Sequence, residues 1–319
     1  MKVARYVGDG KIVIANEPAP ACPAGGLLVR TQASGLCSGE LMSWYMDRKI
    51  PHVLGHEVVG TILESDDARF AVGDRVFPHH HAPCLSCEFC REGLYVHCAQ
   101  WKRTKLDPGG MADVFAVGNE NLSDTVKVNE LRPRDGALVE PLACVMKSFR
   151  LSAHSGGQER TAVIGLGVMG LIHLIVVGEG AVGYDLNPAR IDWARRQGLH
   201  AEHPEKAEPA SCVYVCPGSQ GAFDFAMQLA RPGATIVMFA PLAPSQELRL
   251  PQDIYFRDIK LVHSYSCGPD DTAMAVQAIK GGRLKAEQVV SHFIGIDELP
   301  VAYEDMKAGR ILKPMVLFE

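Results

Sequence analysis

The sequence predicts an α/β protein with a mostly β N-terminal part and a doubly wound parallel sheet. From residue 1 to about 145, short β-rich runs such as "HEVVGTILES" and "DRVFPHH" are broken by glycine and proline, as in an irregular β domain. From about residue 160, strand-like runs from "TAVIG" to "KLVHSYS" alternate with helical patterns. Such alternation is typical of parallel strands joined by helices. After about residue 268, two amphipathic helices and the strand "KPMVLFE" follow.

Length and composition predict two domains and exclude several classes of partner. The 319 residues suffice for two cores, which we assign to 1–145 with 268–319, and to 146–267. A net charge of −5 gives no reason to expect nucleic acid or an anionic membrane. The N-terminus lacks the apolar core of a secretory signal, and the apolar run 162–178 is too short and glycine-rich for a membrane span. We therefore expect a cytoplasmic protein, with no membrane as partner.

Four cysteines in "CLSCEFCREGLYVHC" have the spacing of a structural metal site. The pattern C-x2-C-x2-C-x7-C lets one short loop place four thiolates around a tetrahedral ion. Zinc bound by four sulfurs has no coordination position for a substrate, so it would hold the loop and catalyse nothing. An iron–sulfur cluster or unligated thiols are the alternatives. The four residues are Cys84, Cys87, Cys90 and Cys98.

The neighbouring histidines and the remaining cysteines are assigned supporting roles. Three consecutive histidines precede the loop, and we expect them at the surface or beside metal ligands, because a site of four thiolates is already full. Several further cysteines are most simply read as small buried hydrophobic residues. The histidines are His79, His80 and His81, and the cysteines are Cys144, Cys212, Cys216 and Cys267.

A second, open metal site is indicated by residues far apart in the chain. Cys37 lies in "ASGLCSGE", His56 and Glu57 lie in "LGHEVVG", and Glu140 lies in "VEPLAC". One thiolate, one imidazole and one or two carboxylates leave room for water or an alcohol on zinc. Zinc there would act as a Lewis acid on a bound hydroxyl. Taken alone, a single cysteine and a single histidine are also compatible with plain packing.

The segment "VIGLGVMG" predicts a dinucleotide-binding loop. Its G-x-G-x-x-G pattern follows a strand and opens a helix, so the glycines allow a tight turn and a close approach to pyrophosphate. Asp185 ends the next strand, where a carboxylate accepts hydrogen bonds from ribose hydroxyls and repels a 2′-phosphate. This favours NAD over NADP, although Arg190 lies nearby. Cys216 ends another strand of this sheet and could contact the cofactor. The loop residues are Gly165, Leu166, Gly167, Val168, Met169 and Gly170.

Taken together, these motifs resemble the zinc-dependent medium-chain dehydrogenase/reductase family. They are "GLCSGE", "GHEVVG", "GDRV", the four-cysteine loop, "EPLAC", "VIGLGVMGL" and "YDLNPAR", and they cover essentially the whole chain. The acidic third ligand in "EPLA" makes the branch look like the sorbitol and threonine dehydrogenases. The resemblance implies a GroES-like catalytic domain with a Rossmann domain inserted into it. It also implies that Cys37 and His56 bind a catalytic zinc, with Glu57 and Glu140 either ligating it or holding its water.

The resemblance further implies two zinc ions per chain, one catalytic and one structural, with NAD as the coenzyme. The expected reaction is hydride transfer between a secondary alcohol or polyol and its ketone, in a homodimer or homotetramer assembled through edges of the Rossmann sheet. Two alternatives belong to other classes. One is a zinc-free reductase that prefers NADPH, and the other is a non-catalytic relative that binds a dinucleotide.

Two departures from the family concern the reacting groups. The family carries a proton-relaying hydroxyl two residues after the cysteine ligand, and here that position is Gly39. We expect Ser38 to relay the proton, with water, His52 or Glu57 as the rival. The polyol branch also carries an Arg-Tyr pair where this chain has Ser264 and Tyr265, which argues against sorbitol itself.

A third departure shortens the Rossmann half. Only "LHAEHPEKAEPAS", residues 199–211, joins the second helix to the strand "CVYVC", where the family has a further strand and a crossover helix. Pro204 and Pro209 disfavour a helix in this segment. We therefore predict a trimmed sheet without the crossover helix, and a more open adenine side of the cofactor site.

Overall fold

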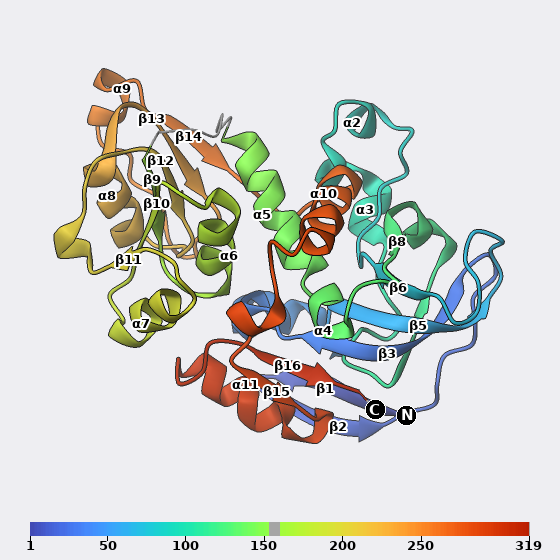
Figure 1. The fold of residues 1–319 in the computed structure, drawn as a ribbon. Coiled ribbons are helices and arrows are strands. Elements are labelled where there is room, and N and C mark those ends of the chain that lie inside the picture. Colours follow the sequence, from blue (N-terminus) through green and yellow to red (C-terminus); the bar gives the residue numbers. More distant parts are fainter. Residues whose placement is uncertain (153–159, 319) are drawn as a thin grey trace. The chain divides into compact units, whose positions relative to one another are not determined.

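The computed structural model describes residues 1–152 and 160–318, which form two compact units (Figure 1). Unit 1 comprises Met1–Ala143 and Cys267–Glu319, and unit 2 comprises Cys144–Ser266. Unit 1 is mostly β and unit 2 holds a parallel sheet with helices, so the predicted α/β class is confirmed.

Unit 1 is built on two sheets. One has the order β2-β1-β4, and the larger has the order β15-β16-β3-β5-β6-β8, with β7 also paired with β3. The strands are β1 (Lys2–Gly8), β2 (Lys11–Asn16), β3 (Leu27–Gly35), β4 (His52–Val53), β5 (Glu57–Ser65), β6 (Arg75–Pro78), β7 (Val114–Val117), β8 (Thr125–Lys127), β15 (His292–Ile294) and β16 (Pro314–Leu317). Its helices are α1 (Ser43–Met46), α2 (Glu88–Arg91), α3 (Ala99–Arg103), α4 (Pro133–Gly136), α10 (Pro269–Lys280) and α11 (Leu299–Lys307).

The core of the larger sheet comes from apolar residues on one face of neighbouring strands. Val29 of β3, Val58 and Ile62 of β5 and Phe115 of β7 pack together, each almost completely buried. Burying one such side chain contributes about 1.5–3 kcal/mol. This packing fixes the register of β3 against β5, and therefore the positions of the residues at their ends.

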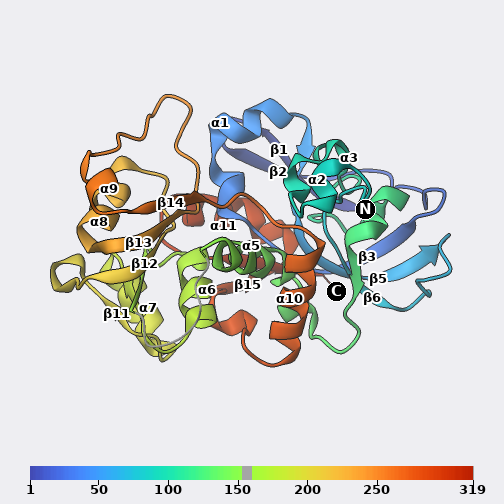
Figure 2. The same cartoon turned by 90° about the horizontal axis from the view of Figure 1, so that it is seen from above.

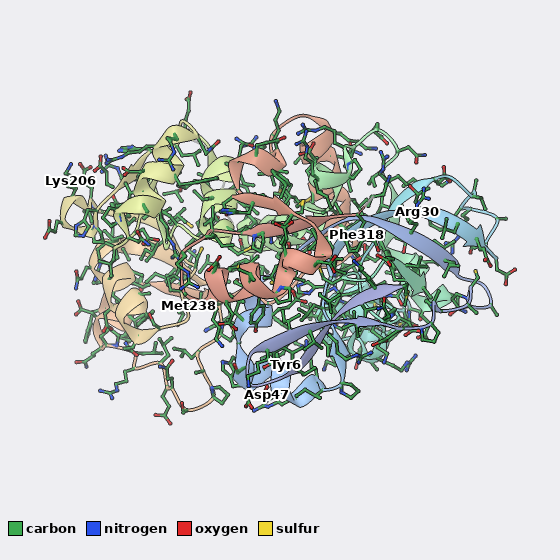
Figure 3. The ribbon with its side chains drawn as sticks, turned by 90° about the horizontal axis from the view of Figure 1, so that it is seen from below. Tyr6, Arg30, Asp47, Lys206, Met238 and Phe318 are labelled. Carbon is green, nitrogen blue, oxygen red and sulfur yellow. The ribbon has the colours of Figure 1, made fainter. Side chains whose placement is uncertain are left out.

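The segment that follows Cys37 is anchored to the smaller sheet through a tyrosine. Tyr6 of β1 is fully buried, and its hydroxyl donates a hydrogen bond of 2.7 Å to the carboxylate of Asp47 (Figure 3). The same hydroxyl accepts from the backbone N–H of Gly10. Asp47 directly follows α1, so this contact holds the short helical segment between Cys37 and His56 against the sheet.

Unit 2 contains a six-stranded sheet with the order β11-β10-β9-β12-β13-β14, and all its pairings are parallel. Its strands are β9 (Thr161–Ile164), β10 (Ala181–Tyr184), β11 (Ala201–Glu202), β12 (Ala210–Val215), β13 (Ala230–Met238) and β14 (Lys260–His263). Its helices are α6 (Val168–Val177), α7 (Pro188–Arg196), α8 (Gln220–Leu229) and α9 (Asp253–Phe256).

Helices cover both faces of this sheet, as the alternating pattern predicts. Val213 and Val215 of β12 pack with Phe223 of α8, whereas Tyr214 between them contacts the ring of His173 in α6. Because successive side chains of a strand point to opposite faces, α6 and α8 lie on opposite faces (Figure 1). This is the doubly wound arrangement.

The prediction that the crossover helix is missing is confirmed, and the prediction that the sheet lacks the additional strand is wrong. Between β11 and β12 the chain forms only a single 3-10 turn, Pro204–Lys206, because Pro204 and Pro209 lack the N–H groups that a helix needs. The additional strand is present, however, as the two-residue edge strand β11, in which Ala201 pairs with Gly183 of β10. A parallel pairing of two residues leaves no pattern that sequence inspection can detect.

Helix α5 (Val139–Leu151) begins in unit 1 and continues into unit 2. The residue pattern of this segment did not predict a helix. Glu140 lies in its first turn, so the helix holds that carboxylate in a fixed direction. Of the helices that the structure describes, none combines the length and the apolar character that crossing a membrane requires.

Candidate metal centres and dinucleotide site

Three of the side chains singled out above converge at one end of the larger sheet of unit 1. Strands β3 and β5 are antiparallel with Gly35 opposite Glu57, so Cys37, just beyond β3, meets His56, just before β5. One ligand atom each from Cys37, His56 and Glu57 lies within 4.8 Å of the other two. A thiolate, an imidazole and a carboxylate at such separations are a donor set that suits zinc.

The imidazole of His56 is oriented by a carboxylate for which the sequence predicted no role. Glu40 is 3 % exposed, and its Oε1 lies 3.3 Å from Nδ1 of His56. Glu40 also accepts hydrogen bonds from the backbone N–H groups of Gly55 and Cys37. Burial alone would raise its pKa, yet His56 and Gly55 hold the pKa of Glu40 at about 2. With Nδ1 facing Glu40, the other ring nitrogen of His56 is left for a metal.

The electrostatic potential around the imidazole of His56 is negative. Burial lowers the pKa of His56, but the carboxylate of Glu40 and the thiol of Cys37 raise it well above its usual value. A field that favours a positive imidazole also favours a bound cation. The sequence carried one signal for Glu40, an acidic residue three positions after the cysteine, where it also closes a capping box on the 3-10 helix Ser38–Leu41.

Glu57 is paired with a lysine from the other end of the chain. Nζ of Lys313 donates to a carboxylate oxygen of Glu57 and to the backbone oxygen of Leu36, the latter at 2.9 Å. Burial raises the pKa of Glu57, Lys313 lowers it, and the nearby Glu140 raises it further, with a net upward shift. No sequence signal pointed to Lys313, which lies just before β16.

The structure places Glu140 in a different group from Cys37. Its carboxylate lies within 4.8 Å of ligand atoms of His79 and Cys267, and all three residues are buried. His79 is fully buried, so of the two expected positions, at the surface or beside metal ligands, the surface is excluded for it. Its backbone N–H and its Nδ1–H both point to Asp124.

The other two histidines of the triplet form a row of stacked rings. His80 lies 4.8 Å from the ring of His56 and 4.1 Å from that of His81, centre to centre. The His81 ring in turn lies 4.2 Å from Trp101, and its Nδ1–H donates to the backbone oxygen of Thr104. Burial keeps the pKa of His81 low, at about 3. The rings of His80 and His81 are therefore uncharged at neutral pH. The row runs from His56, in the candidate catalytic set, to Trp101, which packs beside the four-cysteine loop.

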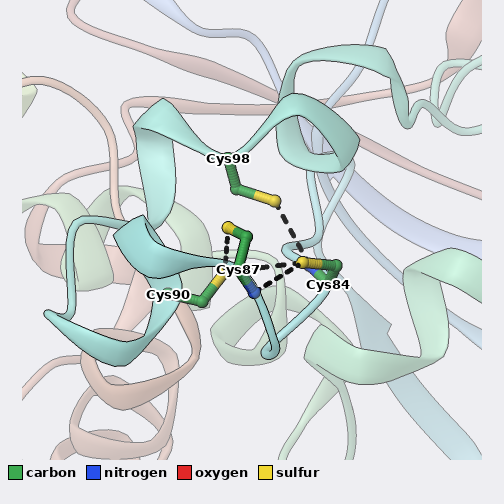
Figure 4. Close-up of side chains that lie close together, drawn as sticks. All are labelled: Cys84, Cys87, Cys90 and Cys98. Carbon is green, nitrogen blue, oxygen red and sulfur yellow. Dashed lines mark hydrogen bonds between the residues drawn. The ribbon is translucent and has the colours of Figure 1, made fainter.

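The four cysteines of the predicted structural site are brought together in a small lobe that contains α2 and α3 (Figures 1 and 2). Figure 4 shows their sulfur atoms turned toward one another. Sγ of Cys90 lies 3.5 Å from that of Cys87 and 3.9 Å from that of Cys84. These separations exceed a disulfide bond and match the edge of a tetrahedron of about 3.8 Å expected for Zn–S bonds of about 2.3 Å. The group consists of Cys84, Cys87, Cys90 and Cys98.

Hydrogen bonds to sulfur support thiolates in this lobe. The hydroxyl of Ser86 and the backbone N–H of Cys87 both donate to Cys84, and together they lower its pKa to about 5. The N–H of Cys84 donates to the sulfur of Cys98. Burial and hydrogen bonds with the sulfurs of Cys87 and Cys98 raise the pKa of Cys90 to about 12, so the four sulfurs differ in their ease of ionisation.

In unit 2 the glycine loop has the geometry that a dinucleotide requires. Gly165 has a positive φ of 85°, and a side chain at Gly170 would overlap the backbone oxygen of Gly165. Around Gly167, by contrast, no heavy atom of the described chain lies within 4 Å of an added Cβ. Gly167 caps the N-terminus of α6, and the N-terminus of a helix is a place that suits an anion such as pyrophosphate. Leu166 and Val168 are buried beneath the loop.

Asp185 and Cys216 lie beside this loop. The carboxylate of Asp185 accepts hydrogen bonds from the backbone N–H groups of Leu166 at 2.6 Å and Asn187 at 2.8 Å. Arg190 lies 3.6 Å from the same carboxylate. The sulfur of Cys216 lies 3.8 Å from Nδ1 of His173, and burial raises its pKa to about 12.

Residues 23–129 match the alcohol dehydrogenase GroES-like domain family. The chain is 28% identical over 324 residues to D-altritol 5-dehydrogenase of Agrobacterium fabrum, which covers 94% of both chains. It is 25% identical to L-threonine 3-dehydrogenase of Sinorhizobium medicae over 92% of this chain and 91% of the relative.

The fold is shared with solved structures over nearly the full length. A zinc-binding dehydrogenase structure from Sinorhizobium meliloti, bound to NADP, superposes with a TM-score of 0.87 at 22% identity, covering 99% of both chains. At that identity the likeness concerns the fold alone. The chain therefore carries an alcohol dehydrogenase GroES-like domain over residues 23–129, and over its length it is similar to zinc-dependent medium-chain dehydrogenases/reductases of the branch of the sorbitol and threonine dehydrogenases.

Proposed function

We propose that this chain is a zinc-dependent dehydrogenase that interconverts a secondary alcohol or polyol and its ketone by hydride transfer to and from a nicotinamide dinucleotide. The observation that carries the proposal is the convergence of Cys37, His56 and Glu57 within 4.8 Å at one end of a sheet. A protein that only binds a dinucleotide has no physical need of this donor set. The relative from Agrobacterium fabrum, D-altritol 5-dehydrogenase, supports a polyol as the substrate.

Cys37 and His56 would hold the catalytic zinc, with Glu57 as the nearest carboxylate. Zinc bound there supplies Lewis-acid stabilisation of an alkoxide. Glu40 keeps the imidazole of His56 in one tautomer and orientation. Lys313 balances the charge of Glu57, so the carboxylate can stay ionised although it is buried. Glu140 acts on this centre through its charge beside Glu57.

Ser38 is the proposed proton relay, and His52 is its rival. A side chain at Gly39 would lie 3.5 Å from the sulfur of Cys37, so the position where the family carries its hydroxyl is adjacent to the metal set. Glycine at this position provides no hydroxyl group. Ser38 is exposed on the neighbouring turn. Burial lowers the pKa of His52 to about 4, which makes it a neutral acceptor at pH 7. A Ser38→Ala variant with lowered kcat supports Ser38, whereas a loss confined to His52→Gln assigns the relay to His52.

The coenzyme is proposed to be NAD rather than NADP. The negative charge of Asp185 at the end of β10 repels a 2′-phosphate, and its two backbone hydrogen bonds hold it in place. Arg190 is the group that could favour NADP, the coenzyme present in the related structure from Sinorhizobium meliloti. The ratio of kcat/KM for NAD to that for NADP measures the preference, and Asp185→Asn should lower this ratio.

The decisive test combines metal content with activity. Cys37→Ser should lower the zinc content by one ion per chain and abolish NAD reduction across a panel of secondary alcohols and polyols that includes D-altritol. Cys22→Ser is the matched control, because Cys22 belongs to none of the metal-binding groups among the described residues. Full zinc content and unchanged activity in Cys37→Ser would refute the proposal and favour a zinc-free reductase.

We also propose a homo-oligomer assembled through the sheet of unit 2. Strand β14 ends the sheet order, so one of its edges pairs with no other strand in the described chain. An open edge of this kind can pair with a second copy. Light scattering of the purified protein distinguishes a monomer from a dimer or tetramer.

A further inference from the structure

Unit 1 contains a third set of metal-binding side chains, outside the two that the sequence predicted. His79 follows β6, Glu140 lies in the first turn of α5, and Cys267 precedes α10. One ligand atom from each lies within 4.8 Å of the other two. His79 and Cys267 are fully buried, and Glu140 is 6 % exposed. The set therefore joins three separate segments of the fold inside the protein.

Asp124 fixes the direction in which His79 points. Nδ1–H of His79 donates to Oδ2 of Asp124 at 2.7 Å, and the backbone N–H of His79 donates to the backbone oxygen of Asp124. Because Nδ1 is used in this way, Nε2 faces the sulfur of Cys267 at 3.6 Å. A carboxylate that binds the far nitrogen of a histidine is the arrangement that orients metal-ligating histidines in proteins.

The separation of the two donor atoms fits a common metal. For Zn–N of about 2.0–2.1 Å and Zn–S of about 2.3 Å, a tetrahedral angle places nitrogen and sulfur about 3.6 Å apart. An N–H···S hydrogen bond reaches the same distance, so this contact does not by itself distinguish the two. The carboxylate of Glu140, which converges on the same point, adds a third donor that a simple thiol–imidazole pair does not require.

The charges around this set also favour a bound cation. Asp124 and Glu140 bring two buried carboxylates to this place, and the second oxygen of Asp124 accepts no hydrogen bond among the described residues. Buried negative groups are stable when they are paired or bind a metal. A divalent cation would offset most of the negative charge of these two carboxylates and a thiolate of Cys267.

We propose that His79, Glu140 and Cys267 bind a third divalent metal ion of the zinc class, held by one nitrogen, one oxygen and one sulfur. Its role is structural, because the ligands are buried and tie the end of β6 to the starts of α5 and α10. The proposal is independent of the dehydrogenase function. It assigns Glu140 to this third centre and leaves Cys37, His56 and Glu57 as the ligands of the candidate catalytic one.

Counting metal ions on intact protein tests the proposal. Protein purified with Zn²⁺ under reducing conditions is analysed by native mass spectrometry and elemental analysis. We expect three zinc ions per chain in the wild type and two in both Cys267→Ala and His79→Ala. Cys212→Ala is the matched control, since Cys212 is also a buried cysteine but belongs to none of the three groups, and it should retain three.

Each result separates this proposal from the proposed function. Two zinc ions in the wild type that stay two in Cys267→Ala, while Cys37→Ser loses one, overturn the third centre and leave the dehydrogenase intact. Loss of one zinc in Cys267→Ala with no change in Cys37→Ser supports the third centre and refutes the proposed catalytic one. If the variants do not fold, cadmium-substituted wild-type protein should give three cadmium NMR resonances, and two would overturn the proposal.

Discussion

Lys313 and Glu57 form an ion pair in which both side chains are almost completely buried, with 1 % and 2 % of their surface exposed. The pair lies 256 residues apart in sequence, and it joins the start of β16 to the start of β5 beside the candidate catalytic metal set. The additional bond from Lys313 to the backbone oxygen of Leu36 also ties it to the end of β3. The ends of three neighbouring strands are therefore locked around Cys37.

Replacing Lys313 by methionine should destabilise the protein by about 3–5 kcal/mol, because it leaves the carboxylate of Glu57 buried and without its cation. Chemical denaturation measures the change. Combining it with Glu57→Gln should restore part of the loss, since the unpaired charge is removed. Lys102→Met, at an exposed lysine of α3, is the control. Losses that simply add in the double variant would contradict the pairing.

Glu40→Gln should weaken zinc binding at the candidate catalytic centre by about 10–100-fold, the usual cost of removing a carboxylate that orients a metal-ligating histidine. Competition with a chelator gives the affinity. The four-cysteine centre supplies an internal control, since its zinc should be released at the same chelator concentration as in the wild type. If the zinc affinity of the candidate catalytic centre is the same in Glu40→Gln as in the wild type, Glu40 does not orient His56.

The glycine loop offers a matched pair of substitutions. The added methyl group of Gly167→Ala meets open space in the fold, so the melting temperature should be unchanged. The affinity for NAD should fall at least about tenfold, because the methyl group occupies the place where the pyrophosphate would approach. Gly170→Ala should instead destabilise the fold by about 1–3 kcal/mol, through overlap with the backbone of Gly165. Calorimetry gives both quantities. Unaltered NAD affinity in Gly167→Ala would show that the dinucleotide does not bind at this loop.

Cys98→Ser should remove one zinc ion per chain and lower the melting temperature, because binding of a structural zinc contributes directly to the folding free energy of the small lobe that contains α2 and α3. Elemental analysis and thermal unfolding measure the two effects. Cys144→Ser, at a buried cysteine outside the metal-binding groups of the described residues, should keep its full zinc content. An unchanged zinc content in Cys98→Ser would favour unligated thiols.

His173 should make stability depend on pH. Burial lowers its pKa from 6.5 to about 4, so between these values the unfolded chain binds a proton and the folded one does not. The free energy of unfolding should therefore fall by about 3 kcal/mol as the pH drops from about 6.5 to 4. His173→Phe should lose this part of the slope. His200→Gln, at an exposed histidine, should show the wild-type slope, and a wild-type slope in His173→Phe would refute the assignment.

Features coded within one short stretch of chain could be predicted from the sequence. The four-cysteine loop and the loop from Gly165 to Gly170 depend on spacing within a few turns, so the residue pattern nearly determines the local geometry. The alternation of strands and helices likewise predicted the parallel sheet, because periods of two and 3.6 residues are visible in the sequence. The missing crossover helix followed from Pro204 and Pro209 for the same local reason.

Only the tertiary structure decided which distant residues meet. Glu57 faces Lys313, and His79 faces Cys267 across 188 residues, because strand registers and helix packing bring those segments together and no local pattern encodes that choice. For the same reason the sequence grouped Glu140 with Cys37 and Glu57 alone, whereas the direction of α5 places it near Glu57 and beside His79 as well. The sequence by itself determined the kinds of site this protein has, and the packing of distant segments determined which side chains make up each one.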